Sequence, residues 1–320
     1  MTEHEFERIA RIRKRLSGAG GGDGEGVVVG IGDDAAVLAP SESSQIVTVD
    51  VAVEGVHFRR EWGSWRVLAR RAVVCAASDV AAMGGRGRCA LVALVLPAGF
   101  ADAALDEIAD GIADAARECK APVVGGNLSS GTELSITTTV IGEVDGAPMR
   151  RSGARPGDGI YVTGPVGAAG LGLAILARGG PVDEEPHRYF VERWRRPIAR
   201  LVEGMRLRNT ATACIDVSDG LLADLGHLCE QSSVGARLYA SELPLARGFR
   251  ELARTFDLDP IELALGSGDD YQLLFTAPAT PVAKQLATRI GEVRPADDGV
   301  VALGEHGEPL TVSHAGWQHR

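Results

Sequence analysis

Residues 27–38, VVVGIGDDAAVL, begin like a nucleotide-binding loop and then depart from one. A short apolar run is followed by Gly30 and Gly32 in a GxGxxA pattern, typical of a strand that turns into a helix and holds a phosphate on backbone N–H groups. Asp33 and Asp34 stand where that phosphate would lie. Two unit charges about 4 Å apart interact by about 4 kcal/mol at an effective dielectric constant near 20. The stretch therefore predicts either no phosphate or a phosphate bridged by a cation.

The composition is that of an acidic globular protein. The chain has 320 residues and a formal net charge of −10, with 45% hydrophobic and 24% charged residues. This length predicts two domains, and the apolar runs are too short or too interrupted to cross a bilayer. The scattered basic residues form no stripe for a nucleic-acid backbone. We therefore expect neither a membrane nor a nucleic-acid partner.

Two further features concern the N-terminal segment and the cysteines. The N-terminal segment has the helical spacing of a surface helix, through Phe6, Ile9, Ile12 and Leu16, and lacks the apolar core of a secretory signal. The five cysteines are an odd number without a CxxC pair, which argues against a zinc site or a disulfide framework. The N-terminal segment favours a cytoplasmic protein.

Strand-like apolar runs alternate with helical patterns in both halves of the chain. In the first half, strands are expected near 27–31, 46–49, 89–96 and 134–141, and helices near 65–77 and 102–119. A stretch rich in Gly and Pro, 150–167, predicts a hinge between domains at 1–149 and 150–320 and leads into a strand, IYVTG. In the second half, helices are expected near 168–178, 186–208, 220–231 and 280–290, and strands near 213–217, 235–239 and 271–276. The mixture predicts an α/β (α+β) fold with two lobes.

Acidic residues follow apolar strands in both lobes. Such turns occur at 30–34, 47–50, 77–85, 214–225 and 266–275. Strand alternation points Asp216 and Ser218 to one face, and Asp219 opens the helix that follows. Mg²⁺ takes carboxylate, hydroxyl and carbonyl oxygens together with substrate phosphates, so we expect several Mg²⁺ ions to bridge these acids and a phosphate. The simpler alternative for any one of them is a turn residue or a helix cap.

Asp79 has two interpretations. Helical spacing from Ala72 and Ala76 extends the apolar face of the 65–77 pattern to position 79, which places the carboxylate on the buried side. A buried carboxylate needs a partner or a metal. Alternatively, the helix ends at Ser78 and Asp79 caps the next segment.

Two familiar phosphate-binding sites do not fit. A P-loop needs Gly-Lys, and the lysines at 14, 120 and 284 follow Arg, Cys and Ala. A Rossmann dinucleotide site is disfavoured by the acids at 33 and 34 and by the lack of an obvious βαβ continuation. The glycines at 164, 167, 170 and 172 fit either a phosphate loop or tight helix packing.

Eight motifs together resemble a known family. They are GIGDDAAVL, VTVDVAVEGVHF, SDVAAMGG, VVGGN, RSGARPGDGIYVTGPVG, IDVSDGLLADLGHL, SGDDYQLLFT and GWQH. In order and spacing, from about residue 5 to residue 318, the chain resembles the thiamine-monophosphate kinases of the aminoimidazole ribonucleotide synthetase-like ATP-binding superfamily. The resemblance implies a two-lobed PurM-like fold in a homodimer, with the N-terminal lobe sheets pairing into a β-barrel and a C-terminal α/β lobe. It also implies transfer of the γ-phosphoryl group of ATP to thiamine monophosphate, the last step of thiamine diphosphate biosynthesis.

The resemblance assigns roles to residues of this sequence. The positions that match metal ligands are Asp34, Thr48, Val49 through its backbone carbonyl, Asp50, Asp79, Asn127, Asp216 and Asp219. Among them, Asp34, Asp50 and Asp216 are expected to act in catalysis through the metal. The positions that match ATP contacts are Gly126, Asn127, Arg151 and Ser218. The positions that match thiamine-phosphate contacts are His57, Asp269 and Trp317.

The chain departs from the family pattern at three of these positions. Asn127 stands where the family usually has Asp, Asp269 where it usually has Glu, and Val49 where many relatives have Ser or Thr. Taken alone, His57 also fits a structural histidine, Trp317 a packing anchor, and Arg151 a solvated turn residue. Two other functions stay open at this point: another branch of the superfamily with an acyl, formyl or selenium substrate, and a protein that binds nucleotide or cation without catalysis.

Overall fold

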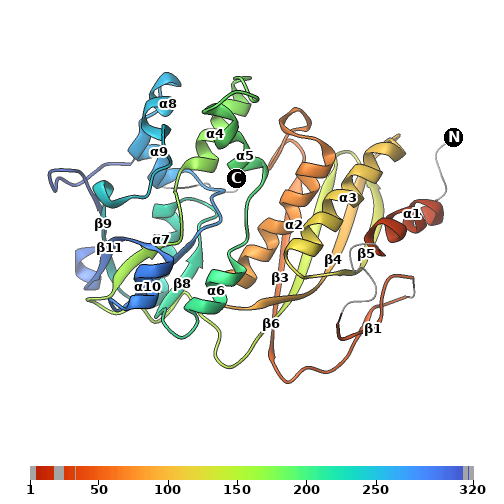
Figure 1. The fold of residues 1–320 in the computed structure, drawn as a ribbon, viewed down its shortest axis with the longest axis horizontal. Helices are drawn as coiled ribbons and strands as arrows, with labels where there is room; N and C mark the ends of the chain where they lie inside the picture. Colours follow the sequence, from red (N-terminus) through yellow and green to blue (C-terminus); the bar gives the residue numbers. More distant parts are fainter. Residues whose placement is uncertain (1–4, 18–24, 33, 313–315, 317–320) are drawn as a thin grey trace. The chain divides into compact units, whose positions relative to one another are not determined.

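The computed structural model describes residues 5–17, 25–32, 34–312 and 316 (Figure 1). They fold into two compact units. Unit 1 comprises Met1–Val80 and Gly85–Gly146, and unit 2 comprises Ala81–Gly84 and Ala147–Arg320. None of the helices in the described part of the chain combines the length and the apolar character needed to cross a bilayer.

Unit 1 is built on a four-stranded sheet in the order β3-β6-β4-β5. The strands are β3 (Ser44–Val53), β4 (Arg86–Pro97), β5 (Val123–Gly131) and β6 (Ser135–Val144). The β4–β5 pair is parallel and the other pairs are antiparallel. The helices are α1 (Glu5–Ser17), α2 (Trp65–Ala82, which extends into unit 2) and α3 (Asp102–Glu118), with a short 3₁₀ turn η1 (Arg60–Trp62). Figure 1 shows α2 and α3 side by side on one face of the sheet, which buries the apolar positions of both helices.

The opening stretch VVVGIGDDAAVL forms a small ribbon. Strand β1 (Val27–Val29) pairs antiparallel with β2 (Val37–Leu38). Residues 30–36 therefore connect two strands, and no helix follows β1. A strand-to-helix phosphate loop does not form here, in agreement with the acids in this segment.

A row of carboxylates on α3 binds arginines from two other helices. The acids recur every four residues, at 102, 106, 110, 114 and 118. Four residues turn an α-helix by about 400°, so each acid lies about 40° further around the axis than the one before it. The row therefore begins on the side that faces α1 and ends on the side that faces α2.

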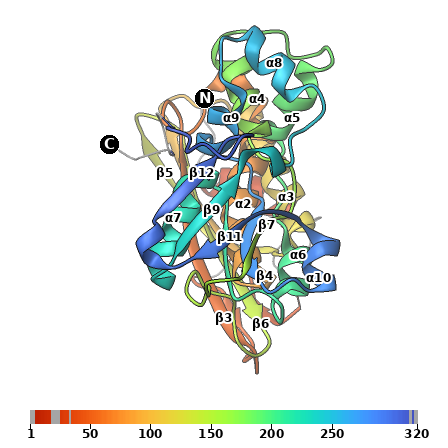
Figure 2. The same ribbon diagram turned by 90° about the vertical axis from the view of Figure 1, so that its left-hand side faces the viewer.

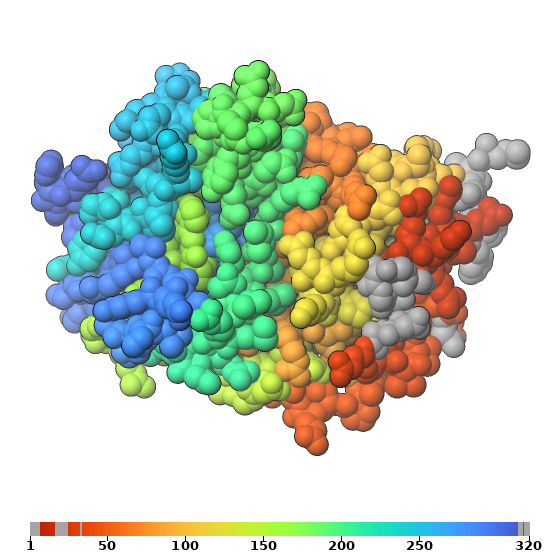
Figure 3. Space-filling model, in the orientation of Figure 1, coloured from red at the N-terminus to blue at the C-terminus, as the bar shows by residue number. Residues whose placement is uncertain are grey.

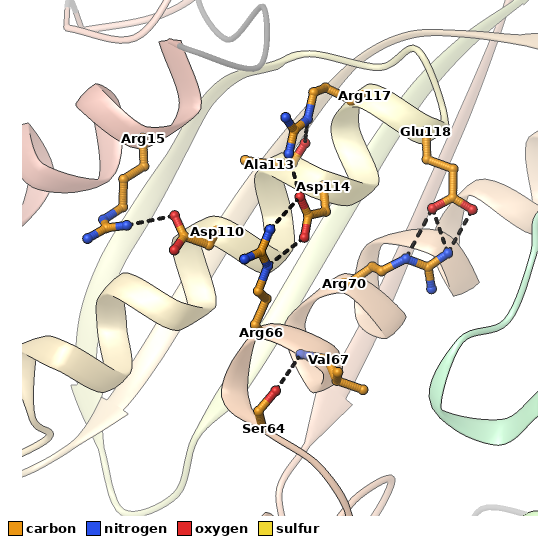
Figure 4. Close-up of polar contacts among 10 residues, drawn as sticks. All are labelled: Arg15, Ser64, Arg66, Val67, Arg70, Asp110, Ala113, Asp114, Arg117 and Glu118. Atoms are coloured by element: carbon orange, nitrogen blue, oxygen red, sulfur yellow. Dashed lines mark hydrogen bonds and ion pairs between the residues drawn. The ribbon is translucent and has the colours of Figure 1, made fainter. Parts of the chain in front are cut away.

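The observed ion pairs follow this rotation. The arginines of α1 pair with the first three acids, at 2.8 Å for Arg8–Asp102, 3.0 Å for Arg11–Asp106, 2.9 Å for Arg15–Asp106 and 2.7 Å for Arg15–Asp110. The arginines of α2 pair with the last two, at 2.6 Å for Arg66–Asp114 and 2.5 Å for Arg70–Glu118 (Figure 4). In the space-filling view, α1 (red) lies against α3 (yellow) (Figure 3). We call the five acids of α3, at 102, 106, 110, 114 and 118, the α3 acid row.

Unit 2 contains a six-stranded sheet in the order β12-β9-β11-β7-β10-β8. Its strands are β7 (Gly159–Val162), β8 (Ala213–Asp216), β9 (Gly235–Tyr239), β10 (Leu273–Ala277), β11 (Thr288–Arg294) and β12 (Val300–Leu303). All neighbouring pairs are antiparallel except β12–β9, which Figure 2 shows at one side of the sheet. Strand β8 ends at the acidic sequence DVSDG, and β10 begins just after GSGDDYQ, so these two loops lie at one end of adjacent strands.

Seven helices accompany this sheet in the described part of unit 2. They are α4 (Ala168–Ala177), α5 (His187–Arg195), α6 (Leu201–Leu207), α7 (Leu221–Ser232), α8 (Phe249–Thr255), α9 (Pro260–Gly266) and α10 (Pro281–Leu286). Two 3₁₀ turns, η2 (Ala240–Glu242) and η3 (Ala296–Asp298), complete the described elements. Helix α7 packs against β8, β9, β10 and β12 and so supports the end of β8 from one side.

Several predicted elements differ from the observed ones. The helix expected over 186–208 is two helices, α5 and α6, because Pro197 lacks a backbone N–H and disfavours helical geometry in the residue before it. The helix expected over 280–290 ends at Leu286, and Thr288 begins strand β11, which pairs with two neighbours. Strand β5 was not predicted, because its glycines weaken the strand pattern.

Two smaller questions from the sequence are also answered. Helix α2 runs past Ser78 to Ala82, so Asp79 lies within the helix and is not a cap for a following segment. The five cysteines are buried free thiols.

Candidate functional site

In unit 1, Thr48 and Asp50 of β3 lie close to Asp79 of α2. The Thr48 Oγ1 donates a hydrogen bond of 2.5 Å to Asp79 Oδ2. Thr48 and Asp50 are two residues apart on one strand and so share a face of the sheet. The pKa of Asp50 is raised, first because the surrounding protein desolvates its carboxyl group and second because the negative charge of Asp79 is near. Part of the Asp50 side chain is nevertheless exposed. The negative charge of Asp79 beside the carboxyl group of Asp50 forms an environment that favours a cation.

His57 contributes to this part of unit 1 through its own loop. Its Nδ1 accepts a hydrogen bond of 3.1 Å from the N–H of Val53, and its backbone N–H donates to the Val53 carbonyl at 2.9 Å. The N–H of Gly55 donates a hydrogen bond of 2.8 Å to the Phe58 carbonyl, which closes the loop. The Phe58 side chain is buried. His57 therefore has the structural role that the sequence left open. With Nδ1 as the acceptor, a neutral imidazole carries its proton on Nε2, which makes Nε2 a donor.

Gly126 and Asn127 lie on β5, paired with Val92 and Ala93 of β4. A Cβ atom at Gly126 would lie only 1.9 Å from the carbonyl oxygen of Val92. The glycine is therefore required by the close approach of the two strands, whether or not it contacts a nucleotide. Asn127 is exposed on the same strand.

The remaining predicted residues of unit 1 are described only in part. Asp34 is exposed in the connection between β1 and β2, and its neighbour Asp33 lies outside the described residues. Val49 is on β3 between Thr48 and Asp50, with a side chain that is 65% exposed.

In unit 2, the sequence DVSDG at residues 216–220 forms a compact loop between β8 and α7. Asp216 ends β8 and its side chain is only 4% exposed, whereas Ser218 and Asp219 are partly exposed. A single carboxylate oxygen, Asp224 Oδ2, accepts hydrogen bonds from the N–H groups of residues 218, 219 and 220 at 3.0, 3.1 and 3.1 Å. Burial raises the pKa of Asp224 to about 7, while these three N–H groups oppose the shift.

The loop that precedes β10 braces the same segment from the other side. The N–H of Asp269 donates to the Ser218 carbonyl at 2.8 Å. Asp269 adopts a left-handed backbone conformation (φ 70°), and its carboxylate accepts from Trp194 Nε1 at 3.0 Å and from the Tyr271 hydroxyl at 3.3 Å. Trp194 is fully buried, so this donor is fixed in place. The predicted substrate residue Asp269 is thus oriented by two aromatic donors.

Arg151 and Trp317 complete the predicted set. Arg151 is exposed, and its carbonyl accepts a hydrogen bond of 3.0 Å from Ser232 Oγ of α7. Trp317 lies outside the described residues. Its neighbour Gly316 is described, and a Cβ atom there would lie 3.1 Å from the carbonyl oxygen of Asp219. Gly316 therefore lies beside the DVSDG loop.

The glycines at 164–172 have packing explanations. A Cβ atom at Gly172 would lie 2.0 Å from the Phe190 carbonyl oxygen, and one at Gly170 would lie 2.2 Å from Ser267 Cβ. The N-terminus of α4 is occupied by Asp270, whose two carboxylate oxygens accept from Gly167 N–H at 2.5 Å and Ala169 N–H at 3.0 Å. This region is therefore a packed helix start with an internal cap.

The donor atoms in both units suit a hard cation. They are carboxylate, hydroxyl and amide oxygens, which are the ligands of Mg²⁺, and Mg²⁺ commonly binds through one or two carboxylates together with substrate phosphates. Among the residues that the structure describes, no group of three or more His, Cys, Asp or Glu side chains lies close enough to hold a metal ion. The pair Asp50–Asp79 with Thr48, and the loop with Asp216 and Asp219, fit ions that also use phosphate oxygens.

Comparison with known proteins identifies the family. Residues 32–144 match the family AIR synthase related protein, N-terminal domain, and residues 155–304 match its C-terminal domain. The thiamine-monophosphate kinase of Escherichia coli K12 is 35% identical over 98% of this chain and 98% of its own length. That of Aquifex aeolicus is 34% identical over 90% of this chain and 92% of its own length. This chain belongs to the thiamine-monophosphate kinase family.

Solved structures of the thiamine-monophosphate kinase family share the fold. The enzyme from Stenotrophomonas maltophilia K279a has a TM-score of 0.82 at 34% identity, covering 97% of this chain and 99% of that one. A structure named "AaThiL complexed with AMPPCP and TMP" has a TM-score of 0.80 at 32% identity and covers 100% of both chains. These findings confirm the family resemblance and the mixed α/β, PurM-like fold that the motifs predicted.

Sequence reasoning missed three residues that shape the site. Asp224 and Asp270 accept backbone N–H groups, and Trp194 donates to Asp269. The role of Asp224 could have been predicted from the sequence, because it lies in the first turn of a helix, where acidic side chains accept hydrogen bonds from N–H groups that have no partner within the helix. Trp194 had none, because 75 residues separate it from Asp269.

Proposed function

We propose that this protein transfers the γ-phosphoryl group of ATP to thiamine monophosphate, giving thiamine diphosphate and ADP. The bond from the γ-phosphorus to the β-phosphate oxygen breaks, and a bond forms from that phosphorus to a phosphate oxygen of thiamine monophosphate. The observation that carries the proposal is the alignment of nearly the whole chain with thiamine-monophosphate kinases, together with full coverage of a structure that contains AMPPCP and TMP. AMPPCP is an analogue of ATP that cannot transfer its terminal phosphoryl group.

We assign the metal-binding residues of each unit as follows. In unit 1, we assign Thr48, Asp50, Asp79, Asn127 and the Val49 carbonyl to Mg²⁺, with Asp34 as a further ligand from the β1–β2 connection. In unit 2, we assign Asp216 and Asp219 to Mg²⁺. Bound Mg²⁺ would neutralise charge on the phosphates of two anionic substrates.

The other assigned residues would bind and orient the two substrates. Gly126, Asn127, Arg151 and Ser218 are assigned to ATP, where an exposed guanidinium suits a phosphate. His57 would donate a hydrogen bond from Nε2 to the phosphate of thiamine monophosphate, and the fixed carboxylate of Asp269 would face its cationic part. Trp317 would offer an aromatic face to the same ligand. Because the acceptor is a phosphate already ionised at neutral pH, no strong general base is required.

Unit 1 also supports a homodimer. Val47, Val49 and Val51 alternate along β3 and are 66%, 65% and 41% exposed. Among the described strands, β3 is at the edge of its sheet, so its outer edge pairs with none of them, and its valines form an exposed apolar face. A second copy of this chain that pairs sheet to sheet would cover both. We assign residues 1–149 to ATP and metal binding and to dimerisation, residues 150–320 to the α/β lobe, and the cytoplasm as the compartment.

A turnover assay tests the proposal. Purified protein is incubated with ATP, Mg²⁺ and thiamine monophosphate, and thiamine diphosphate is measured by chromatography. Formation of thiamine diphosphate and ADP in equal amounts is expected, with loss of both products when Mg²⁺ is chelated. Hydrolysis of ATP without thiamine diphosphate would indicate another branch of the superfamily. Binding of ATP with no change in it would indicate a protein without catalysis.

A further inference from the structure

The DVSDG loop turns its backbone N–H groups toward the interior of unit 2. Three consecutive N–H groups, those of residues 218–220, converge on Asp224 Oδ2 at 3.0, 3.1 and 3.1 Å. The preceding N–H, that of Val217, donates to the Gln272 carbonyl at 2.8 Å. Every N–H from 217 to 220 therefore has a partner within the protein.

Two carbonyls of the same loop are also held. The Val217 carbonyl accepts from the N–H of Tyr271 at 2.8 Å, and the Ser218 carbonyl accepts from the N–H of Asp269 at 2.8 Å. A Cβ atom at Gly268 would lie 2.0 Å from the Ser218 carbonyl oxygen, which shows how closely the bracing loop approaches. Because these backbone groups are already hydrogen-bonded within the protein, the loop can bind a cation through its side-chain oxygens.

Consecutive N–H groups that converge on one point form a nest, a concavity that usually binds a phosphate or another anion. In this loop, the carboxylate of Asp224 occupies the place of the anion. The Asp224 side chain is only 2% exposed, so it fills the concavity from inside the unit. A phosphate group cannot use the same three N–H groups while Asp224 holds them.

A second place in unit 2 has the same arrangement. The glycine-rich segment before α4 offers N–H groups of Gly167 and Ala169, and both donate to the buried carboxylate of Asp270. The two segments that most resemble phosphate loops in this unit are thus both filled by a carboxylate of the protein itself.

We propose that Asp224 is a positioning residue that fills the nest of the DVSDG loop and fixes the side-chain oxygens of Asp216, Ser218 and Asp219 for a cation. Substrate phosphates would accordingly be reached through cations and through side chains, and not through the backbone N–H groups of this loop. The inference rests on the proposed function, because that function supplies the cation and the phosphates.

The test compares two aspartates that cap backbone N–H groups in the same unit. Asp224→Asn keeps the size of the side chain and one acceptor oxygen but removes the charge. Asp259→Asn is the matched control, because Asp259 Oδ1 accepts from Ile261 and Glu262 N–H groups at 2.9 and 2.8 Å at the start of α9, away from the loop. Binding of Mg²⁺ is measured by calorimetry with AMPPCP present, so that no turnover is needed.

We expect Asp224→Asn to weaken Mg²⁺ binding by about 10- to 100-fold, the usual effect of removing a group that orients metal ligands. Asp259→Asn should bind Mg²⁺ within about twofold of the unmodified protein. Asp224→Ala should bind Mg²⁺ as weakly as Asp224→Asn, and added formate should restore part of the affinity by entering the emptied nest. Equal affinities in Asp224→Asn and the unmodified protein, or an equal loss in Asp259→Asn, would overturn the inference.

A second measurement covers the case in which the Asp224 variants do not fold. Hydrogen exchange of the amides of residues 218–220 is followed by NMR in the unmodified protein without ligand. Slow exchange supports an internally filled nest, and exchange as fast as in an open loop overturns it. If Mg²⁺ and AMPPCP bind as expected but no thiamine diphosphate forms in the turnover assay, the proposed function fails and the positioning role of Asp224 stands.

Discussion

Two neighbouring glycines on β5 are expected to respond very differently to the same substitution. A Cβ atom at Gly126 would lie 1.9 Å from the Val92 carbonyl oxygen, whereas one at Gly125 would meet the flexible end of Leu91, Cδ2, at 2.9 Å. Ordinary van der Waals contact begins near 3.4 Å. In Gly126→Ala the backbone of β4 or β5 must move, while in Gly125→Ala a side-chain rotation suffices.

The difference can be given a magnitude. Overpacking that displaces backbone costs about 1–3 kcal/mol, and each ladder hydrogen bond lost between β4 and β5 costs about 1 kcal/mol more. We therefore expect Gly126→Ala to lower the free energy of unfolding by about 3 kcal/mol. Gly125→Ala should change it by at most about 1 kcal/mol, because the lower chain entropy of alanine in the unfolded state offsets part of the strain.

Scanning calorimetry and urea unfolding of both variants test this expectation. At roughly 2–4 °C per kcal/mol for a protein part of 150–250 residues, Gly126→Ala should lower the melting temperature by about 6–12 °C. Gly125→Ala serves as the control, since it makes the same chemical change one residue away. If Gly126→Ala unfolds within about 1 kcal/mol of Gly125→Ala, the steric account of VVGGN is wrong.

Three further outcomes are expected. Asp106→Asn removes a carboxylate that pairs with Arg11 and Arg15 in the α3 acid row, and should cost about 1 kcal/mol of stability at low ionic strength and less in 1 M salt, measured by urea unfolding. Burial raises the pKa of Asp270 to about 7 from 3.8, so its contribution to stability is present in acid and is lost as the pH rises toward 7. The stability of the unmodified protein relative to Asp270→Asn should fall between pH 4 and pH 7, and a pH-independent difference would refute the shift. In steady-state assays, Asp50→Asn should reduce kcat far more than His57→Ala, because the proposed role of Asp50 is to bind the metal, whereas that of His57 is to donate one hydrogen bond; equal losses would contradict these proposed roles.

Several local features of this protein could be predicted from its sequence. Of the two interpretations of Asp79, the one from helical spacing is the one that the structure supports: Asp79 lies within α2 and accepts a hydrogen bond from Thr48. The apolar run near 213–217 predicted the strand that carries Asp216, and β8 spans Ala213–Asp216. The family motifs then supplied the architecture that periodicity alone could not, since strand order joins residues far apart in the chain.

What the sequence could not provide are contacts made across long distances. Residues 288–290 read as the end of a helix, but they begin strand β11, and pairing with two neighbouring strands overrides their local preference. The hydrogen bond from Trp194 to Asp269 depends on how α5 lies against the loop that precedes β10. The filled nest at Asp224 required knowledge of which N–H groups turn inward, and backbone direction within a loop is not encoded by residue type alone.

Crystals grown with Mn²⁺, AMPPCP and thiamine monophosphate would test the central claim most directly, through the anomalous scattering of the metal. We expect Mn²⁺ within ligand distance of Asp50 and Asp79 and within ligand distance of Asp216 and Asp219, with nucleotide phosphates bound to the ions. Phosphates seated on the N–H groups of residues 218–220, or metal found away from these four carboxylates, would contradict it.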